Sequence, residues 1–392
     1  MVKLANPDIC SGCGACAYRC PQRCITMEEN SIGIVLPHID EKSCKDCHAC
    51  EKVCPMLHEV QSNQSKKAYA AWSLDEEERR TSASGGIGAE MYKMAIIMGY
   101  KIIGAVQQED FSVKHKMSES ADAISCFKNS KYVFSSAYDV FPQIEDALQA
   151  SRKVLFIGLP CQVAAMRKLY KNDDNLLLVE VVCHGTSPVS YLRQHIDMLN
   201  RQTGNVAKWM SFRDSCSFIF ALYNSEGSRF YAKQTKDGDT YQFGYHRAVS
   251  YRENCYHCPF AKPERNANIT IADYHGLGLV RPVTFSAGDV SLILVNDEKG
   301  QRFVDALMQG GYIFAEERPL EEPFKGDAQL RHPSLKNKYR IQFEKCIREE
   351  CGNFERAILR PHKNFMRSEM LNRIKEISKH AVRKIIKLIG IQ

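Results

Sequence analysis

The sequence lacks two features that would place the protein in or across a membrane. Its longest apolar runs reach only about eight residues, whereas a membrane-spanning helix needs roughly 20. The N-terminus has no apolar segment of the kind found in secretory signal peptides. We therefore expect a cytoplasmic protein.

The chain also lacks a broad basic region in its main part. The formal net charge is +7, but residues 363–392 alone carry eight Lys/Arg and two Glu. Residues 1–60 carry six Lys/Arg and eight Asp/Glu, which leaves +3 for everything between these two segments. Because nucleic-acid-binding domains concentrate positive charge on one face, we expect no nucleic-acid partner.

Cysteine, in contrast, is abundant and patterned, with 17 residues in a chain of 392. Cys10, Cys13, Cys16 and Cys20 precede Pro21, and the same spacing returns 34 residues later at Cys44, Cys47, Cys50 and Cys54 before Pro55. The pattern C-x2-C-x2-C-x3-C-P is that of bacterial two-cluster ferredoxins. Disulfides suit small secreted domains, and zinc sites favour separated C-x2-C pairs, so both alternatives fit less well.

In this pattern the fourth cysteine of each run binds the other cluster. We therefore assign one [4Fe–4S] cluster to Cys10, Cys13, Cys16 and Cys54, and the other to Cys44, Cys47, Cys50 and Cys20. Cys24 falls outside the spacing and is interpreted as a packing residue. A domain of about 60 residues has a small core, so we expect the clusters to hold it together.

The remaining chain alternates between helix and strand patterns after a polar linker at 58–67. Helices are expected at 85–99, 138–150, 162–170 and 188–200, and strands at 101–106, 153–158 and 175–182. Further strands are expected at 208–214, 217–223, 228–233, 268–274 and 291–297. This order predicts a mainly parallel α/β sheet followed by a segment of α+β character.

We divide the chain into four parts on this basis. A ferredoxin domain at 1–60 precedes a mixed α/β body, whose two parts span 66–203 and 204–340, and a basic helical tail spans 341–392. The tail places Ile374, Ile377, Ala381, Ile385 and Leu388 at helical spacing among Lys and Arg. Such a helix packs on its own protein, docks onto an acidic partner, or lies on an anionic membrane surface.

Four further cysteines form a second candidate metal site. Cys161 and Cys183 each end a strand-like segment, and Cys255 and Cys258 form a C-x2-C-P motif. If the strands are parallel, the first two cysteines reach one edge of the sheet, where α/β folds bind cofactors. The four residues are a candidate set of ligands for a third [4Fe–4S] cluster. Buried thiols, a redox dithiol or half a zinc site are the alternatives.

Six motifs in order carry a resemblance to a known family. They are SASGG (82–86), KNSKYVFSS (128–136), GLPCQVAAMR (158–167), CHGTSP (183–188), SFRD (211–214) and CYHCPFAKPERNANITIADYHG (255–276). Over residues 66–310 the chain resembles the coenzyme F420 hydrogenase/dehydrogenase beta-subunit family. The resemblance implies an iron–sulfur flavoprotein that passes electrons between clusters, FAD and a substrate. It also strengthens the third-cluster assignment.

The resemblance also suggests residues that bind FAD. Ser84, Gly85 and Gly86 precede a helix, whose N-terminus attracts a phosphate group. Lys131, Ser135 and Gln162 are further candidates, and His184 is a candidate proton donor beside the flavin ring. An ordinary capped helix, a solvated strand end and a loop histidine are the structural alternatives. Asp273, at the end of a strand, either orients a ligand or bonds to neighbouring backbone.

We therefore expect an FAD- and iron–sulfur-dependent oxidoreductase acting on a small organic molecule. Its electron partner would be a protein such as ferredoxin or a reductase. The alternative is a non-catalytic electron-transfer subunit that docks to a separate catalytic protein. The motifs identify neither the substrate nor F420 itself, and peripheral membrane contact rests on the basic tail alone.

Overall fold

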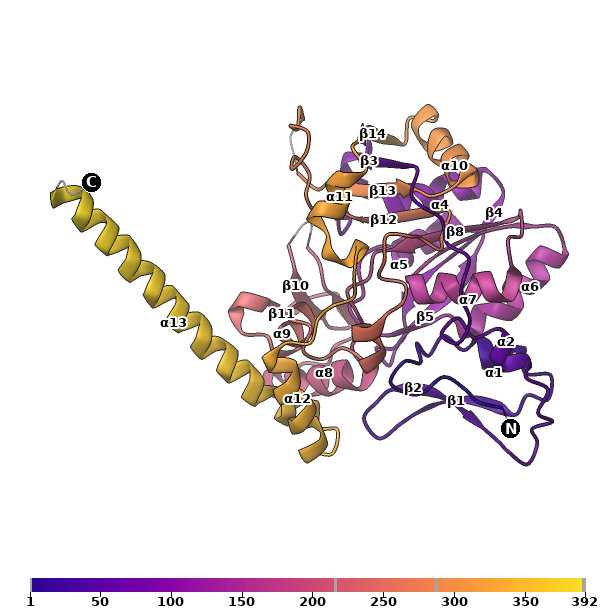
Figure 1. The fold of residues 1–392 in the computed structure, drawn as a ribbon, viewed down its shortest axis with the longest axis horizontal. Coiled ribbons are helices and arrows are strands. Elements are labelled where there is room, and N and C mark those ends of the chain that lie inside the picture. The colour runs from indigo at the N-terminus through magenta and orange to yellow at the C-terminus, as the bar shows by residue number, and fades with distance from the viewer. Residues whose placement is uncertain (1, 215–216, 286–287, 390–392) are drawn as a thin grey trace.

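The computed structural model describes residues 2–214, 217–285 and 288–389, with side chains up to residue 377. A small N-terminal unit packs below a large α/β body, and a long C-terminal helix leaves the body on the opposite side (Figure 1). The termini therefore lie far apart.

The N-terminal unit shows the cysteine repeat as a structural repeat. Helices α1 (Ala15–Arg19) and α2 (Ala49–Lys52) each contain the third cysteine of a run. Each helix follows a residue in the left-handed conformation, Gly14 with φ 80° and His48 with φ 57°. An antiparallel hairpin of β1 (Ile25–Glu29) and β2 (Val35–Ile39) completes the unit. This is the expected two-cluster ferredoxin arrangement.

One nine-stranded mixed sheet forms the centre of the body, in the order β14-β3-β13-β12-β8-β7-β4-β5-β6. Its strands, in chain order, are β3 (Lys67–Ser73), β4 (Tyr100–Gln107), β5 (Val113–Ser118), β6 (Ser135–Ser136), β7 (Lys153–Gly158), β8 (Leu176–Val181), β12 (Ile269–Asp273), β13 (Ser291–Val295) and β14 (Ile313–Arg318). The four central strands β12, β8, β7 and β4 are parallel. Antiparallel pairs flank them on both sides.

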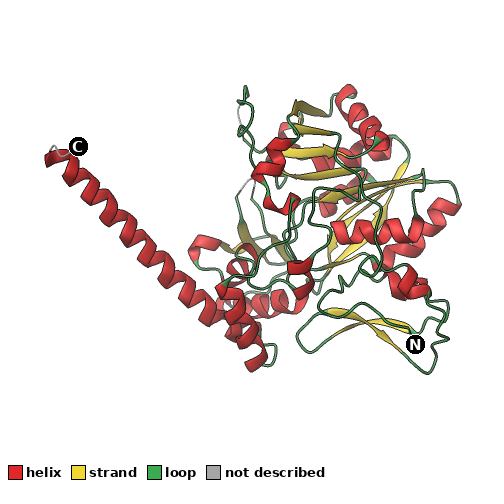
Figure 2. Ribbon diagram, in the orientation of Figure 1, coloured by secondary structure: helices red, strands yellow, loops and turns green. Residues whose placement is uncertain are grey.

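Helices cover both faces of this sheet (Figure 2). On one face lie α4 (Ile87–Ile97), α5 (Ile124–Phe127) and α10 (Glu298–Gln309), which share a core with β4, β7, β8 and β12. On the other face lie α6 (Phe141–Gln149) and α7 (Pro160–Tyr170). The remaining elements at its margins are α3 (Glu76–Thr81), η1 (Ala121–Ala123), η2 (Tyr138–Val140), α11 (Glu321–Gly326) and η5 (Ala328–Leu330).

A second, smaller core surrounds the three-stranded antiparallel sheet of β9 (Trp209–Ser211), β10 (Ile219–Tyr223) and β11 (Arg229–Gln234). Helices α8 (Val189–Thr203), α9 (Thr240–His246), α12 (Lys338–Glu349) and the first turns of α13 (Phe354–Ile389) pack around it. η3 (Thr235–Asp237) and η4 (Glu253–His257) connect its parts. Among the described residues, no helix combines the length and apolarity that crossing a bilayer requires.

The mixed α/β fold class is confirmed, with one correction to the sheet. The segments at 268–274 and 291–297 were expected as two strands of a later segment with α+β character. They form β12 and β13 inside the main sheet instead. The strands expected at 101–106, 153–158 and 175–182 are parallel neighbours as predicted. Antiparallel pairs come from β13 and from β3, β5 and β14, which the apolar pattern did not reveal. The four domain boundaries stay a prediction.

The polar segment at 58–67, predicted as a linker, is tied to the body. Val60 is buried against Ala164 and Phe260. Asn63 and Arg265 exchange backbone hydrogen bonds of 2.9 and 2.8 Å. The ferredoxin unit is therefore held in place at its junction with the sheet.

Candidate redox site

The eight N-terminal cysteines fall into two groups of four. Cys10, Cys13, Cys16 and Cys54 line one small cavity. Cys20, Cys44, Cys47 and Cys50 line another. Each cavity combines three thiols of one run with the fourth thiol of the other run, which is the arrangement that the proline-directed crossing predicts.

Cys24 lies beside the second group. Its Sγ is 3.4 Å from that of Cys20, and it lines the same cavity. The residue is buried, as expected of a packing residue, but it also supplies a fifth thiol at this position. Sequence spacing missed this proximity because the turn after Pro21 folds Cys24 back toward Cys20.

The surroundings of these thiols fit metal clusters. Burial raises the pKa of Cys13 to about 11, so this thiol stays protonated near neutral pH unless a metal ion binds it. The backbone N–H of Gly12 donates to Cys10 Sγ at 3.4 Å. Gly12 has a φ of 69°, and a Cβ there would lie 2.9 Å from Val35 O and Arg252 Nη2. Glycine is therefore required for this close approach.

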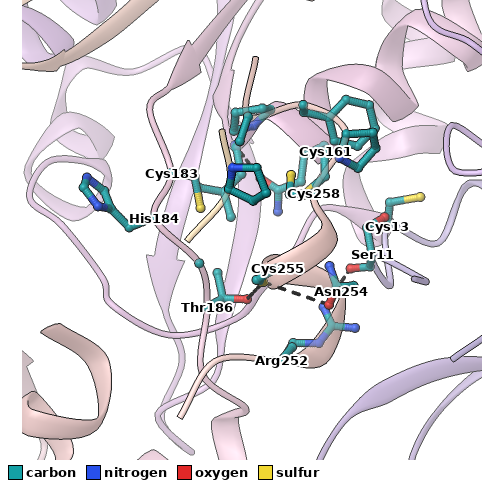
Figure 3. Close-up of a pocket in the computed structure, with 18 of the residues that line it drawn as sticks. Ser11, Cys13, Cys161, Cys183, His184, Thr186, Arg252, Asn254, Cys255 and Cys258 are labelled. Atoms are coloured by element: carbon teal, nitrogen blue, oxygen red, sulfur yellow. Dashed lines mark hydrogen bonds between the residues drawn. The ribbon is translucent and has the colours of Figure 1, made fainter. Parts of the chain in front are cut away.

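The four other candidate cysteines surround one cavity in the body (Figure 3). β7 and β8 are neighbouring parallel strands, so Cys161 and Cys183 emerge at the same edge of the sheet, as predicted. Cys255 in η4 and Cys258 just after it close the cavity from the opposite side. Burial and then the neighbouring thiols raise the pKa of Cys161 well above its usual value.

Backbone and side-chain donors lie around three of the four sulfurs in this cavity. Backbone N–H groups of Phe260 and Ala261 donate to the Cys258 sulfur, and that of Gly185 donates to the Cys183 sulfur. Donors aimed at sulfur stabilise thiolates, which are the form that binds iron. Cys255 Sγ additionally lies 3.9 Å from Thr186 Oγ1.

The four-cysteine cavity adjoins the first N-terminal group. Ser11, Gly12 and Cys13 of the ferredoxin unit line it together with the body cysteines. Arg252 spans this junction, because its guanidinium donates to Ser11 O at 2.7 Å and to Cys10 O at 3.3 Å. The side chain is buried and lies over the Phe134 ring, 4.6 Å from its centroid. No local sequence pattern singled out Arg252.

A second, larger cavity lies on the other side of Cys183. It measures about 1270 Å³ including the part open to solvent. Cys183, Gly185, Thr186, Ser135, Leu159 and Gln162 line both cavities and thus form their common wall.

Most of the residues predicted to bind FAD line this larger cavity. They are Ser84, Gly86, Lys131, Ser135 and Gln162. Gly86, with φ 81°, precedes the first residue of α4, so the N-terminus of an 11-residue helix opens at the cavity. Gly85 is not brought to the cavity. Its N–H donates to Ser291 Oγ at 2.9 Å, and a Cβ there would lie 2.6 Å from Ala71 O.

Lys131 and Gln162 already have internal partners. Lys131 Nζ donates to the carbonyl oxygens of Lys128 at 2.9 Å and Asn129 at 3.2 Å, and burial lowers the pKa of this ammonium group to about 8. Gln162 Nε2 donates to Ser135 O at 2.9 Å and to Ser135 Oγ at 3.1 Å. Gln162 thus fastens β6 to α7 and shapes the common wall.

Asp273 and Arg213 connect the far side of the larger cavity. Arg213 Nη1 donates to Asp273 Oδ2 at 2.9 Å, and Nη2 donates to Ala83 O in the loop before α4. Asp273 lines the cavity, and the ion pair with Arg213 holds its carboxylate in place. Its expected role in orienting a ligand stays a prediction. Arg213 lies in the quoted SFRD motif, but no local pattern revealed its long-range partner.

His184 is not brought to the larger cavity. Figure 3 shows its ring directed away from the four cysteines, on the side opposite Cys161 and Cys258. Cys183 and His184 are successive residues of an extended segment, so their side chains point to opposite sides. The ring instead faces His275, with 6.5 Å between the ring centroids.

Two family models match separate segments of the chain. Residues 9–57 match the 4Fe-4S dicluster domain. Residues 151–321 match the family formed by the C terminus of the coenzyme F420 hydrogenase/dehydrogenase beta subunit. The first segment carries the eight N-terminal cysteines, and the second carries the four cysteines of the body.

Three curated proteins show related sequences. The subunit designated F of the F(420)H(2) dehydrogenase of Methanosarcina mazei is 21% identical over 270 residues, 66% of this chain and 73% of that protein. Coenzyme F420-dependent sulfite reductase of Methanocaldococcus jannaschii is 27% identical over 175 residues, 43% of this chain and 26% of the other. An uncharacterized ferredoxin of the latter organism is 42% identical over 55 residues, 14% of this chain and 32% of the ferredoxin.

Among solved structures, a chain of the F420-reducing [NiFe] hydrogenase complex from Methanosarcina barkeri aligns with a TM-score of 0.43 and 18% identity, over 68% of this chain and 88% of that chain. The dicluster match identifies an iron–sulfur protein of the electron-transfer type. Residues 151–321 are thus similar to the C terminus of the coenzyme F420 hydrogenase/dehydrogenase beta subunit, and residues 9–57 carry a 4Fe-4S dicluster domain.

Proposed function

We propose that the protein is an FAD-dependent iron–sulfur oxidoreductase with three [4Fe–4S] clusters. The observation that carries this proposal is the position of the four-cysteine cavity. Its lining includes Ser11, Gly12 and Cys13 of the ferredoxin unit, and it shares Cys183, Gly185 and Thr186 with the larger cavity. An electron path from the N-terminal clusters to a cofactor in the larger cavity therefore has no long gap to cross.

The residues around the larger cavity suit FAD. The N-terminus of α4, with Ser84 and Gly86 beside it, offers unpaired backbone N–H groups to a pyrophosphate. Lys131 adds a cation to the lining of the cavity. Apolar and aromatic side chains, including Ile87, Tyr92, Phe127 and Tyr245, supply surfaces for flat rings. FAD, when bound, exchanges single electrons with clusters and electron pairs with organic substrates.

Side-chain hydrogen bonds hold the two cysteine groups and the two cavities in fixed positions relative to one another. Arg252 fastens the Cys10–Ser11 backbone to the loop that carries Cys255, so the two cysteine groups keep a constant separation. Gln162 and Ser135 fix the wall between the two cavities. Arg213 holds Asp273 against the loop before α4, which closes the end of the larger cavity.

The names of the relatives suggest which organic substrate to test first. Two of the three curated relatives carry F420 in their names, one as part of a dehydrogenase and one as a sulfite reductase. We therefore propose a reduced deazaflavin as the first candidate electron donor. Because the first relative is named as one subunit of an assembly, its name also favours a protein partner that exchanges electrons with the N-terminal clusters.

Metal and flavin content of the anaerobically purified protein test the proposal. We expect about twelve irons per chain, since each cubane holds four. The double variant Cys255→Ala/Cys258→Ala should contain about eight. Acid precipitation should release FAD from the wild type. Lys131→Met should weaken FAD binding, whereas Lys114→Met, at an exposed lysine paired with Asp139, should not.

Two outcomes would contradict the proposal. If the double variant contains as much iron per chain as the wild type, Cys255 and Cys258 do not bind a cluster and have a packing or redox role instead. Protein that neither contains nor takes up FAD would favour the second candidate, an electron-transfer subunit that docks to a separate catalytic protein. The exposed apolar residues of α13 are the specific observation in favour of such docking, since Met370 is 65% and Ile377 69% exposed.

A further inference from the structure

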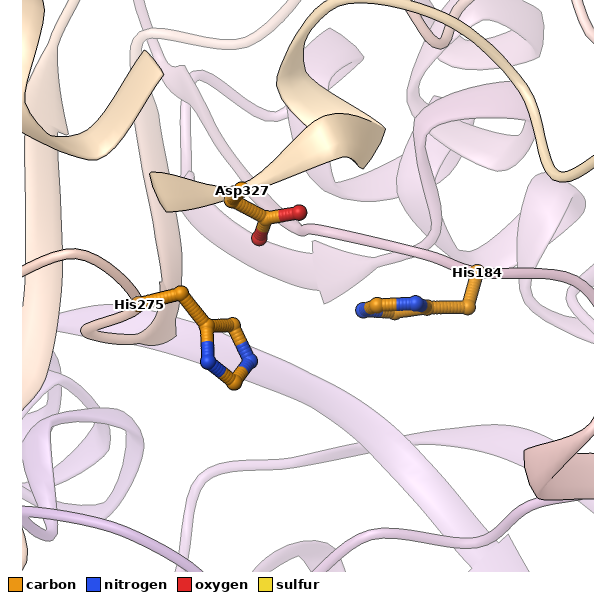
Figure 4. A group of neighbouring side chains, drawn as sticks. All are labelled: His184, His275 and Asp327. Carbon is orange, nitrogen blue, oxygen red and sulfur yellow. The ribbon is translucent and has the colours of Figure 1, made fainter. Parts of the chain in front are cut away.

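Two histidines and an aspartate converge just outside the four-cysteine cavity (Figure 4). His184 follows Cys183 after β8, His275 follows β12 by two residues, and Asp327 follows α11. One ligand atom from each of the three side chains lies within 4.8 Å of the other two. Because β8 and β12 are parallel neighbours, both histidines leave the sheet at the same edge.

One carboxylate oxygen of Asp327 is buried without a hydrogen-bond partner in the part of the chain that the structure describes. The residue is 4% exposed, and its Oδ1 accepts a hydrogen bond of 2.8 Å from the Gln329 N–H. Its Oδ2 is buried and accepts no hydrogen bond from any described residue. An unsatisfied buried carboxylate oxygen is costly, and a bound cation would remove that cost. Figure 4 shows the carboxylate facing the space between the two imidazole rings.

The backbone is built to bring His275 and Asp327 together. Gly276 follows His275, and Gly326 precedes Asp327. A Cβ on Gly276, where φ is 85°, would lie 2.6 Å from Gly326 Cα, and a Cβ on Gly326 would lie 2.3 Å from Gly276 Cα. The two turns thus touch backbone to backbone, which only glycine at both positions permits.

Buried hydrogen bonds lock the same two segments. Glu322 in α11 accepts hydrogen bonds from the Gly278 and Val280 N–H groups at 3.0 and 3.2 Å. The Tyr274 hydroxyl donates to the other oxygen of Glu322 at 3.0 Å. Arg318 neutralises this carboxylate from the neighbouring strand end. The loop after β12 therefore cannot move away from α11 without breaking a buried network.

His184 is tied to the segment that carries Asp327. Ser334 Oγ donates to the His184 carbonyl oxygen at 2.6 Å, and Gln329 Nε2 donates to Ser334 Oγ at 3.2 Å. Gln329 is also the residue whose backbone N–H holds Asp327. Preorganised ligands of this kind are typical of metal sites.

We propose that His184, His275 and Asp327 bind a divalent transition metal ion, of the Zn²⁺ or Fe²⁺ class. Two imidazoles and one carboxylate are a ligand set that both ions accept, with at least one coordination position left open. Both histidines are exposed, so the open position faces solvent. His184 also lines the four-cysteine cavity. The ion would therefore bind and polarise an oxygen ligand at the margin of the redox site.

Metal binding to the full-length, cluster-containing protein tests this inference without reference to flavin or activity. The protein is dialysed anaerobically against a chelator that leaves iron content unchanged, and then against Zn²⁺ or Fe²⁺ in separate arms. We expect one added ion per chain in the wild type. Asp327→Asn and His275→Gln should each weaken binding at least tenfold, since even residues that only support metal ligands contribute about 10–100-fold.

His332→Gln is the matched control, because this exposed histidine lies five residues from Asp327 but outside the group. Binding by the control and loss in both variants, with iron content unchanged, would support the site. The arm with the tighter binding identifies the metal. No added ion in the wild type, or equal binding by His275→Gln and the wild type, would overturn the inference. His275 is exposed, so its substitution keeps the test valid if Asp327→Asn fails to fold.

Discussion

Five thiols gather where a cubane cluster needs four. Cys20, Cys44, Cys47 and Cys50 are the predicted ligands, and Cys24 Sγ lies 3.4 Å from Cys20 Sγ. Because Cys20 and Cys24 lie so close together, substituting Cys20 alone does not remove every thiol near that ligand position. A variant lacking Cys20 keeps a thiol within a short movement of the vacated position.

We predict that Cys20→Ser damages the cluster of Cys44, Cys47 and Cys50, and leaves that of Cys10, Cys13 and Cys16 intact. The reason is that Cys20 lines the cavity of the second run. Loss should be partial in the single variant and complete in Cys20→Ser/Cys24→Ser. Low-temperature EPR of the reduced protein distinguishes the two clusters.

Cys24→Ser alone is the control for this experiment and should keep both clusters. Selective loss of the first cluster in the Cys20 variant would show that the ligands do not cross. Identical spectra of the single and double Cys20 variants would show that Cys24 does not compensate.

At the scale of elements, one buried histidine joins three helices. His195 in α8 lies between Asp239, which precedes α9, and Glu355 in the first turn of α13. Its Nε2 is 3.0 Å from Asp239 Oδ2 and its Nδ1 is 2.8 Å from Glu355 Oε1. Burial alone would lower the pKa of His195, but the two carboxylates outweigh it and raise the pKa to about 9.

This histidine should make stability depend on pH. The pKa of His195 is higher in the folded protein than in the unfolded chain, where it is about 6.5. Protonated His195 therefore contributes its full stabilisation below about pH 6.5, and this contribution to the free energy of unfolding is lost as the pH rises through about 9. From the pKa difference the effect is on the order of 3 kcal/mol. We predict that the difference in thermal midpoint between wild type and His195→Gln shrinks from pH 6.5 to 9.5.

His246→Gln is the matched control. Burial lowers the pKa of His246 to about 4, so its ring is neutral throughout this range. The offset between His246→Gln and the wild type should therefore not change from pH 6.5 to 9.5. A pH-independent offset for His195→Gln as well would show that His195 is not charged in the folded protein.

At the scale of the whole molecule, α13 has two different halves. Phe354, Ala357, Ile358 and Phe365 are buried in the smaller core. Beyond them the helix projects away from the body (Figure 1), and Met366, Met370, Leu371, Ile374 and Ile377 are exposed. Packing on its own protein, one alternative for the tail, leaves Ile377 69% exposed. Ala381, Ile385 and Leu388 lie outside the described side chains.

The exposed apolar residues and the eight Lys/Arg of residues 363–392 predict binding to anionic membranes. Each such cation near the surface contributes about 1 kcal/mol, and salt weakens the attraction. We expect the full chain to co-sediment with phosphatidylserine vesicles at low salt. A chain ending at Phe365, which retains the packed half of α13, should stay in the supernatant.

Met370→Ser/Ile374→Ser/Ile377→Ser keeps the charge and tests the apolar contribution alone. It should bind more weakly than the full chain and still respond to salt. If the full chain also stays in the supernatant, the membrane hypothesis is wrong, and docking to an acidic protein partner becomes the explanation for the exposed helix.

The sequence by itself determined the features that repeat over short distances. The cysteine spacing predicted a two-cluster unit with crossed ligands, because three ligands of each cluster lie on one tight loop. Apolar runs located β7 and β8, and hence the common edge where Cys161 and Cys183 emerge. Helix periodicity placed α4, α6, α7 and α8 close to their observed bounds.

Only the tertiary structure decided what depends on partners distant in the chain. Arg252 contacts Cys10 and Ser11 across more than 240 positions, and Arg213 contacts Asp273 across 60. Asp327 meets His275 because two glycines allow two turns to touch. The strands β3 and β14 belong to the main sheet because β3 pairs in antiparallel fashion with both β13 and β14. Local patterns reflect burial and helix geometry, whereas these contacts follow from how separate segments pack together.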